Sequence, residues 1–140
     1  MFKILSHTAD VALEVQAGNL EALFAEAAEG WKYIVVEKSQ IKPAQVRRVT
    51  LSSFEAEDLL IQWLSELNYF LTVHRWILHK AERIELQSSE NEWRLDAEIS
   101  GEFLDTERHY IYCDIKAVTY HQLNIRKVGG QFFTKIIFDL

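Results

Sequence analysis

The sequence predicts an α+β fold in which two helices pack on a mixed, largely antiparallel β-sheet. Two helix patterns lie in the first half of the chain, each after a strand pattern, and the second half contains strand patterns alone. Segregation of this kind favours α+β over an alternating α/β architecture. The 140 residues suit one domain, and no repeat, low-complexity tract or Pro/Gly/Ser-rich linker divides them. Residues 1–140 are therefore expected to form a single compact domain.

The first helix is predicted to follow Asn19, because asparagine side chains cap helix N-termini. Apolar residues recur after it at the i, i+3, i+4, i+7, i+8 and i+11 spacing of one helical face, and Gly30 lies near its end. The apolar face consists of Leu20, Leu23, Phe24, Ala27, Ala28 and Trp31.

The second helix is predicted to start at Ser53, with acidic residues in its first turn, where the helix dipole favours negative charge. Its buried stripe consists of Leu59, Leu60, Trp63, Leu64, Leu67 and Leu71. Residues 55–72 contain no Lys or Arg, so we expect a strongly acidic exposed face. That face is either an ordinary solvated surface, which we favour, or a docking surface for a basic partner.

Alternation of apolar and polar residues predicts the strands. The patterns cover residues 11–16, 46–51, 84–86, 92–99, 111–116, 123–128 and 131–138. Residues 88–91 are expected to form the loop of a hairpin. The pair Gly129 and Gly130 is typical of a two-residue turn with positive φ, which would join the last two strands.

The composition excludes several classes of protein. The single cysteine, Cys113, rules out an internal disulfide and a cysteine zinc cluster. The apolar runs fall far short of the roughly 20 residues that span a bilayer, and no signal-peptide pattern is visible, so we expect a cytoplasmic protein with no membrane partner. A net charge of −6 argues against strong direct binding to nucleic acid, which needs clustered Lys and Arg.

Common catalytic signatures are absent from the sequence. It has no phosphate-binding loop, no dinucleotide-binding loop and no nucleophile elbow, and its five histidines follow no metal-binding spacing. Cys113 shares strand parity with Ile111 and Ile115, which favours a small core residue over a nucleophile. We expect no catalytic residues, no cofactor-binding loop and no enzymatic activity of the chain itself.

Acidic residues at the two ends of the chain are candidate metal ligands. Asp10, three residues after His7, begins a predicted strand, where it is either a solvated acid or part of a site. Asp139 and Leu140 end an apolar strand, which either frays or holds the Asp139 side chain and the terminal carboxylate close together. Hard divalent cations such as calcium prefer oxygen ligands of this kind. The spacing alone does not pair Asp10 with Asp139.

The segment 116–121 is a further candidate because it is unusually polar for a strand. Lys116 and Tyr120 share one side of it, and Thr119 and His121 share the other. These residues are either acid/base or phosphate-contacting groups, or hydrogen-bonded members of a sheet. We favour the sheet, because no nucleophile, base and orienting group occur together.

The chain resembles the archease family, small proteins that activate RNA-splicing ligases of the RtcB type. The matching segments follow the family's order over nearly the whole chain, and the two polar ones, His-Thr-Ala-Asp and Lys-Ala-Val-Thr-Tyr-His, are together quite specific. The segments are residues 6–11, 20–28, 59–67, 101–102, 105, 115–121 and 139–140. One departure is Ser6, where the family often has an aspartate, so this chain has one carboxylate fewer near the site.

The resemblance implies a metal site and an accessory function. It implies that Asp10, Asp139 and the carboxylate or carbonyl oxygen of Leu140 bind calcium or another divalent cation. It also implies that the protein promotes guanylylation of an RtcB-type ligase, allows its repeated turnover and acts in tRNA splicing. The alternative is a chaperone-like or scaffolding module, docked through the acidic helix, in which the metal only stabilises the fold.

Overall fold

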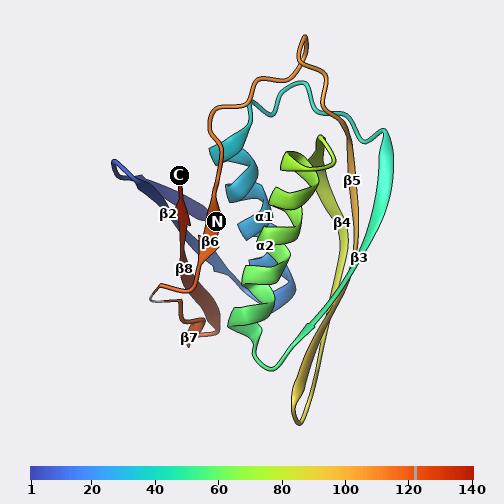
Figure 1. Ribbon diagram of the computed structural model, residues 1–140. Coiled ribbons are helices and arrows are strands. Elements are labelled where there is room, and N and C mark those ends of the chain that lie inside the picture. Colours follow the sequence, from blue (N-terminus) through green and yellow to red (C-terminus); the bar gives the residue numbers. More distant parts are fainter. Residues whose placement is uncertain (122) are drawn as a thin grey trace.

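The computed structural model describes residues 1–121 and 123–140. Two helices, α1 (Leu20–Val35) and α2 (Ala56–Thr72), lie side by side between two antiparallel sheets (Figure 1). The five-stranded sheet consists of β1 (Phe2–Ser6), β2 (Asp10–Ala17), β6 (Ala117–Thr119), β7 (Arg126–Val128) and β8 (Gln131–Asp139). The three-stranded sheet consists of β3 (Gln45–Ser53), β4 (Trp76–Ser89) and β5 (Glu92–Phe103). The predicted α+β class is confirmed, with its strands divided between two sheets.

The first helix begins where the sequence predicts. The side chain of Asn19 accepts a hydrogen bond of 2.8 Å from the Ala22 N–H, and the predicted apolar face packs inward. The helix continues past Gly30 to Val35. Gly30 lies against β2, because a Cβ there would come within 2.5 Å of the Leu13 side chain. This glycine therefore permits close helix–sheet packing and does not end the helix.

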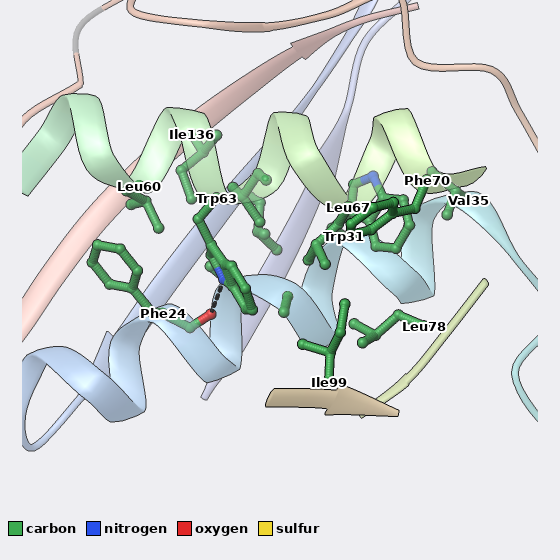
Figure 2. Close-up of a cluster of buried hydrophobic side chains, with 14 of the residues drawn as sticks. Phe24, Trp31, Val35, Leu60, Trp63, Leu67, Phe70, Leu78, Ile99 and Ile136 are labelled. Carbon is green, nitrogen blue, oxygen red and sulfur yellow. Dashed lines mark hydrogen bonds between the residues drawn. The ribbon is translucent and has the colours of Figure 1, made fainter. Parts of the chain in front are cut away.

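The second helix begins at Ala56, three residues after the predicted start. Ser53 instead ends β3, and its hydroxyl donates a hydrogen bond to Asp58 in the first turn of α2. All six residues of the predicted apolar stripe are buried. The Trp63 indole N–H donates to the Phe24 carbonyl at 3.0 Å and so joins the two helices inside the core (Figure 2).

The hairpin predicted around residues 88–91 is confirmed, but its first strand extends back to Trp76. The strand predicted at 111–116 is wrong. This segment makes a single isolated bridge, Val36 with Ile111, because it crosses the end of α1 instead of running along a strand. There the Tyr112 N–H donates to the Val35 carbonyl at 2.8 Å.

The tail forms the predicted hairpin, with β7 shorter than expected. Gly129 and Gly130 have φ values of 58° and 80°, which residues with a side chain rarely adopt. Two glycines therefore let β8 return antiparallel to β7 in a two-residue turn.

Only one face of the five-stranded sheet is covered by the helices (Figure 1). The strand order β1–β2–β8–β6 places β2 and β8 side by side at its centre. Val11, Leu13 and Val15 of β2 face the core, so Asp10 and Glu14, which alternate with them, point to the opposite face. We call that uncovered side the outer face. Among the described residues, no helix is long and apolar enough to cross a bilayer.

Candidate functional site

The two acidic ends of the chain meet on the outer face, where β2 begins and β8 ends. Asp10, the first residue of β2, is the register partner of Asp139, the last residue of β8. The Leu140 N–H donates to the Ala9 carbonyl at 3.2 Å, the pattern that flanks a non-hydrogen-bonded antiparallel pair. In such a pair the Cα atoms lie about 4.5 Å apart and the side chains extend to the same face. We call Asp10, Asp139 and Leu140 the acidic tip.

Backbone hydrogen bonds hold the acidic tip on both sides. The His7 N–H donates to the Asp10 carbonyl at 3.0 Å and closes the turn between β1 and β2. The Lys116 N–H donates to the Asp139 carbonyl at 2.8 Å, next to the register pair Ala117 and Asp139 of β6 and β8. The end of β8 is therefore part of the sheet and not frayed.

The donor set of the tip fits a hard cation in its chemistry. Asp10 and Leu140 are half-buried and Asp139 is exposed. Two side-chain carboxylates and the backbone oxygens of Leu140 are the oxygen ligands that calcium prefers, although calcium takes about six to eight of them. Over residues 1–121 and 123–140, no group of three His, Cys, Asp or Glu side chains is placed to hold a metal ion. A cation here therefore needs further oxygen ligands from water or from a partner.

The acidic tip carries uncompensated charge. None of the ion pairs among the described residues involves Asp10 or Asp139. Like charges directly opposite each other across two strands are destabilising. The pair therefore costs stability as long as no cation lies beside it.

The polar segment 116–121 lies beside the acidic tip, and its residues have different environments. The Tyr120 hydroxyl donates to the Asp58 carboxylate of α2, which raises the pKa of Tyr120. Hydrogen bonds from Ser53 first and Tyr120 second lower the pKa of Asp58. Tyr120 therefore attaches β6 to α2, as the sheet interpretation predicts. Lys116 is exposed, and its side chain forms no ion pair within the described part of the chain.

Two of the four carboxylates in residues 55–72, Glu57 and Asp58, accept hydrogen bonds from neutral donors, which leaves the acidic character of this face in place. Asp58 accepts from Ser53, Tyr120 and, at 2.8 Å, the Gln62 amide. Glu57 accepts a hydrogen bond of 3.1 Å from the Ile125 N–H. Tyr120 and Ile125 lie 62 and 68 residues away from Asp58 and Glu57 in the sequence, so a helical pattern alone does not reveal them.

Cys113 is a half-buried residue and not an exposed nucleophile. Its thiol donates a weak hydrogen bond to the Ile34 carbonyl at 3.4 Å, and burial raises its pKa. A raised pKa leaves less thiolate, the nucleophilic form, at neutral pH.

Sequence reasoning missed a buried ionic cluster around Glu102. This carboxylate, 5% exposed, receives hydrogen bonds from Arg108 at 2.5 and 3.2 Å and from the Lys42 N–H at 2.6 Å. The contact with Arg108, followed by the other hydrogen bonds, lowers the Glu102 pKa to about 2 in spite of burial. The Asp105 N–H donates to His109 Nδ1 at 2.9 Å, so Nε2 carries the proton that His109 donates to Glu102 at 3.1 Å. The run of five polar residues after β5, from Asp105 to His109, was the only signal in the sequence.

The Glu102 cluster holds the start of the segment that runs from the end of β5 to the acidic tip. It joins the loop before β3 to the residues that follow β5, and the chain then continues through Tyr110 and Tyr112, whose backbones bond the end of α1. The same segment reaches β8 at Lys116. The hydrogen bonds of the cluster therefore fix the position of this segment relative to the loop before β3.

Known proteins match the whole chain. The model of the archease protein family (MTH1598/TM1083) matches residues 2–140. The chain belongs to the archease family. The protein archease of Methanosarcina mazei is 32% identical over 139 residues, which cover 99% of this chain and 95% of the relative.

Solved structures in the archease family share the fold. The solution structure of Methanobacterium thermoautotrophicum protein 1598 has a TM-score of 0.83 and 26% identity, covering 99% of this chain and 98% of the other. The Thermotoga maritima crystal structure, described as an archease and possible chaperone, has a TM-score of 0.59 and 24% identity over 100% of this chain and 98% of the other.

Proposed function

We propose that this chain is a cytoplasmic accessory protein of an RtcB-type RNA-splicing ligase and promotes its guanylylation and multiple turnover in tRNA splicing. Membership of the archease family supports this function. The observation that carries it is the direct register pairing of Asp10 with Asp139 where the two central strands β2 and β8 end. In guanylylation, a ligase histidine nitrogen forms a bond to the α-phosphorus of GTP and pyrophosphate leaves.

The residues of the acidic tip have one role each in this proposal. Asp10 and Asp139 present two carboxylates on one face, and the hydrogen bond from Leu140 to Ala9 fixes the direction of the last residue. A bound calcium or other divalent cation would supply positive charge toward phosphate oxygens. Because the tip offers too few ligands to surround a cation, it is suited to share one with groups of the ligase.

The test is multiple-turnover ligation by the cognate ligase with Asp10→Ala, Asp139→Asn and a chain extended by two glycines beyond Leu140. Each change removes or displaces one oxygen donor, and we expect stimulation to fall by about tenfold or more. Glu92→Ala is the matched control, because Glu92 is an exposed carboxylate on the three-stranded sheet. Undiminished stimulation by both Asp10→Ala and Asp139→Asn rejects the proposal.

The alternative, a chaperone-like or scaffolding module with a structural metal, predicts a different result. In that case Asp10→Ala acts by destabilising the fold, so its melting temperature and its activity fall together. Our proposal predicts a folded Asp10→Ala protein that has lost stimulation.

A further inference from the structure

The outer face has a second feature at the end opposite the acidic tip. A groove with a volume of about 510 Å³ lies over β1, β2, β7 and β8, and its lining includes Lys3, Glu14, Gln16, Arg126, Phe133 and Lys135. This volume falls within the roughly 300–1,000 Å³ of small-molecule sites. Glu14 lies four residues along β2 from Asp10, which corresponds to about 13 Å.

The charges in this groove differ in sign from those of the chain. Three side-chain cations, Lys3, Arg126 and Lys135, face one carboxylate, Glu14, whereas the whole chain has a net charge of −6. Lys3 and Lys135 are the register partners of Glu14 on its two sides. None of these four residues takes part in an ion pair within the described residues, and all four are exposed. The groove therefore carries a net positive charge, because Glu14 offsets only one of the three cations.

An aromatic ring lies among these cations. Phe133 is half-buried on the outer face, where its register partners are Gln16 on β2 and Arg126 on β7. Lys135 follows it two residues along β8 and points to the same face. Exposed aromatic rings on antiparallel sheets stack nucleic-acid bases, and adjacent Lys and Arg contact the phosphates.

We propose that this groove binds a nucleoside phosphate, with the base stacked on Phe133 and the phosphate oxygens contacted by Lys3, Lys135 and Arg126. The source is either a free nucleotide or the end of a single-stranded RNA, which present the same chemistry. The net negative charge of the chain weakens long-range attraction of polyanions, but it does not remove the local cations. The proposal concerns the chain alone and does not depend on activation of a ligase.

The first experiment is calorimetric titration of the intact protein with GMP, UMP and inorganic phosphate in the presence of EDTA. We expect nucleotide binding with Kd below about 1 mM. Stacking on Phe133 should make nucleotides bind about fivefold or more tightly than phosphate. Equal affinities for phosphate and nucleotides, or no binding at about 5 mM ligand, overturn the proposal.

Charge variants give opposite and therefore diagnostic effects. Lys135→Gln should weaken GMP binding about three- to fivefold, and Glu14→Gln should tighten it by a similar factor, since each removes one exposed charge. Phe133→Leu keeps an apolar side chain without a π face and should weaken binding about fivefold. Lys127→Gln is the matched control, because Lys127 is an exposed cation on β7 that points away from Arg126. Effects of equal sign for Lys135→Gln and Glu14→Gln overturn the assignment of the site.

A final comparison identifies the source of the nucleotide. Tighter binding of a 5′-phosphorylated oligouridylate than of UMP indicates the end of an RNA, and equal binding indicates a free nucleotide; both outcomes support the site. Binding of an oligoglutamate peptide as tight as that of the oligouridylate indicates a general anion surface and overturns it. Because neither ligase nor metal is present, failure here leaves the proposed ligase function intact, and failure of the ligation test leaves this site intact.

Discussion

The two ends of the outer face are built from the same pair of strands but have opposite electrostatics. At the acidic tip, β2 and β8 place Asp10 directly opposite Asp139. Four residues away, the same strands place Glu14 opposite Lys135. Opposite charges across a strand pair stabilise a sheet, whereas like charges destabilise it. The other directly opposed acidic pair, Glu85 and Asp96 of β4 and β5, is compensated by ion pairs with Arg48 and Arg83. The comparison shows that, among the described strand pairs, only the acidic pair at the tip lacks such compensation.

The largest effect on stability is expected from a cavity beside β8, the strand that contributes residues to both ends of the outer face. Phe138 is fully buried on the core side of β8, next to Asp139. Phe138→Ala leaves a cavity and should lower the free energy of unfolding by about 3–5 kcal/mol, as measured by urea denaturation. Lys135→Ala on the exposed side of β8 is the control and should change it by less than about 0.5 kcal/mol. A small effect of Phe138→Ala would show that burial of Phe138 is not what holds β8 in the sheet.

Loss of the Glu102 carboxylate should affect the acidic tip and leave the groove intact. The Glu102 pKa of about 2 lies below its unfolded value of 4.5, so the carboxylate stabilises the fold above pH 4.5 and loses this effect as the pH falls toward 2. Glu102→Gln should cost about 3 kcal/mol at neutral pH and much less near pH 3. Urea denaturation at the two pH values measures this difference.

The location of the Glu102 effect is a second measurement. Amide hydrogen exchange in Glu102→Gln should accelerate more at Tyr112 and Lys116, which lie on the segment that follows the cluster, than at Phe133 in the groove. Uniform acceleration in both regions would mean that the cluster supports the whole fold and not the tip in particular.

The sequence predicts local elements well and long-range partners poorly. The 3.6-residue period of Leu60, Trp63 and Leu67 and the turn at Gly129-Gly130 are local patterns, and the structure confirms both. The acidic ends are visible as residues, but their pairing depends on the register of strands at opposite ends of the chain. The same holds for Glu14 with Lys135, whose groove no spacing reveals.

The wrong prediction of a strand at residues 111–116 also has a long-range cause. Residues 111–116 alternate like a strand, but the carbonyl of Val35 takes the Tyr112 N–H that a strand partner would otherwise bind. The hydrogen bond from Tyr120 to Asp58 of α2 likewise joins residues from the two halves of the chain. Local patterns do not specify such partners.

Calcium distinguishes the two ends of the outer face, because it should bind at the acidic tip and not in the groove. If the acidic tip binds calcium in the free protein, a tenfold excess over Kd should add about 1.4 kcal/mol of stability, seen as a rise in melting temperature over EDTA. Asp139→Asn should abolish this rise, whereas Lys135→Gln, at the groove end of the same strand, should preserve it. A rise that persists in Asp139→Asn would place the calcium elsewhere.

The smallest expected effect is the change in stability when one charge is removed from each end of the outer face. It is measured with EDTA present so that no divalent cation contributes. Asp139→Asn removes one of two like charges from a cross-strand pair and should raise stability by about 0.5 kcal/mol. Glu14→Gln removes the central charge between Lys3 and Lys135 and should lower stability by about 0.3 kcal/mol. Both changes replace an exposed carboxylate by its amide on the same face of the same sheet, so volume and hydrogen-bonding capacity are closely matched. Local charge alone therefore predicts stability changes of opposite sign for the two variants. Both changes should become smaller as salt is added. Equal signs would mean that the net charge of the chain, and not the neighbours of each carboxylate, determines how the two ends of the outer face behave.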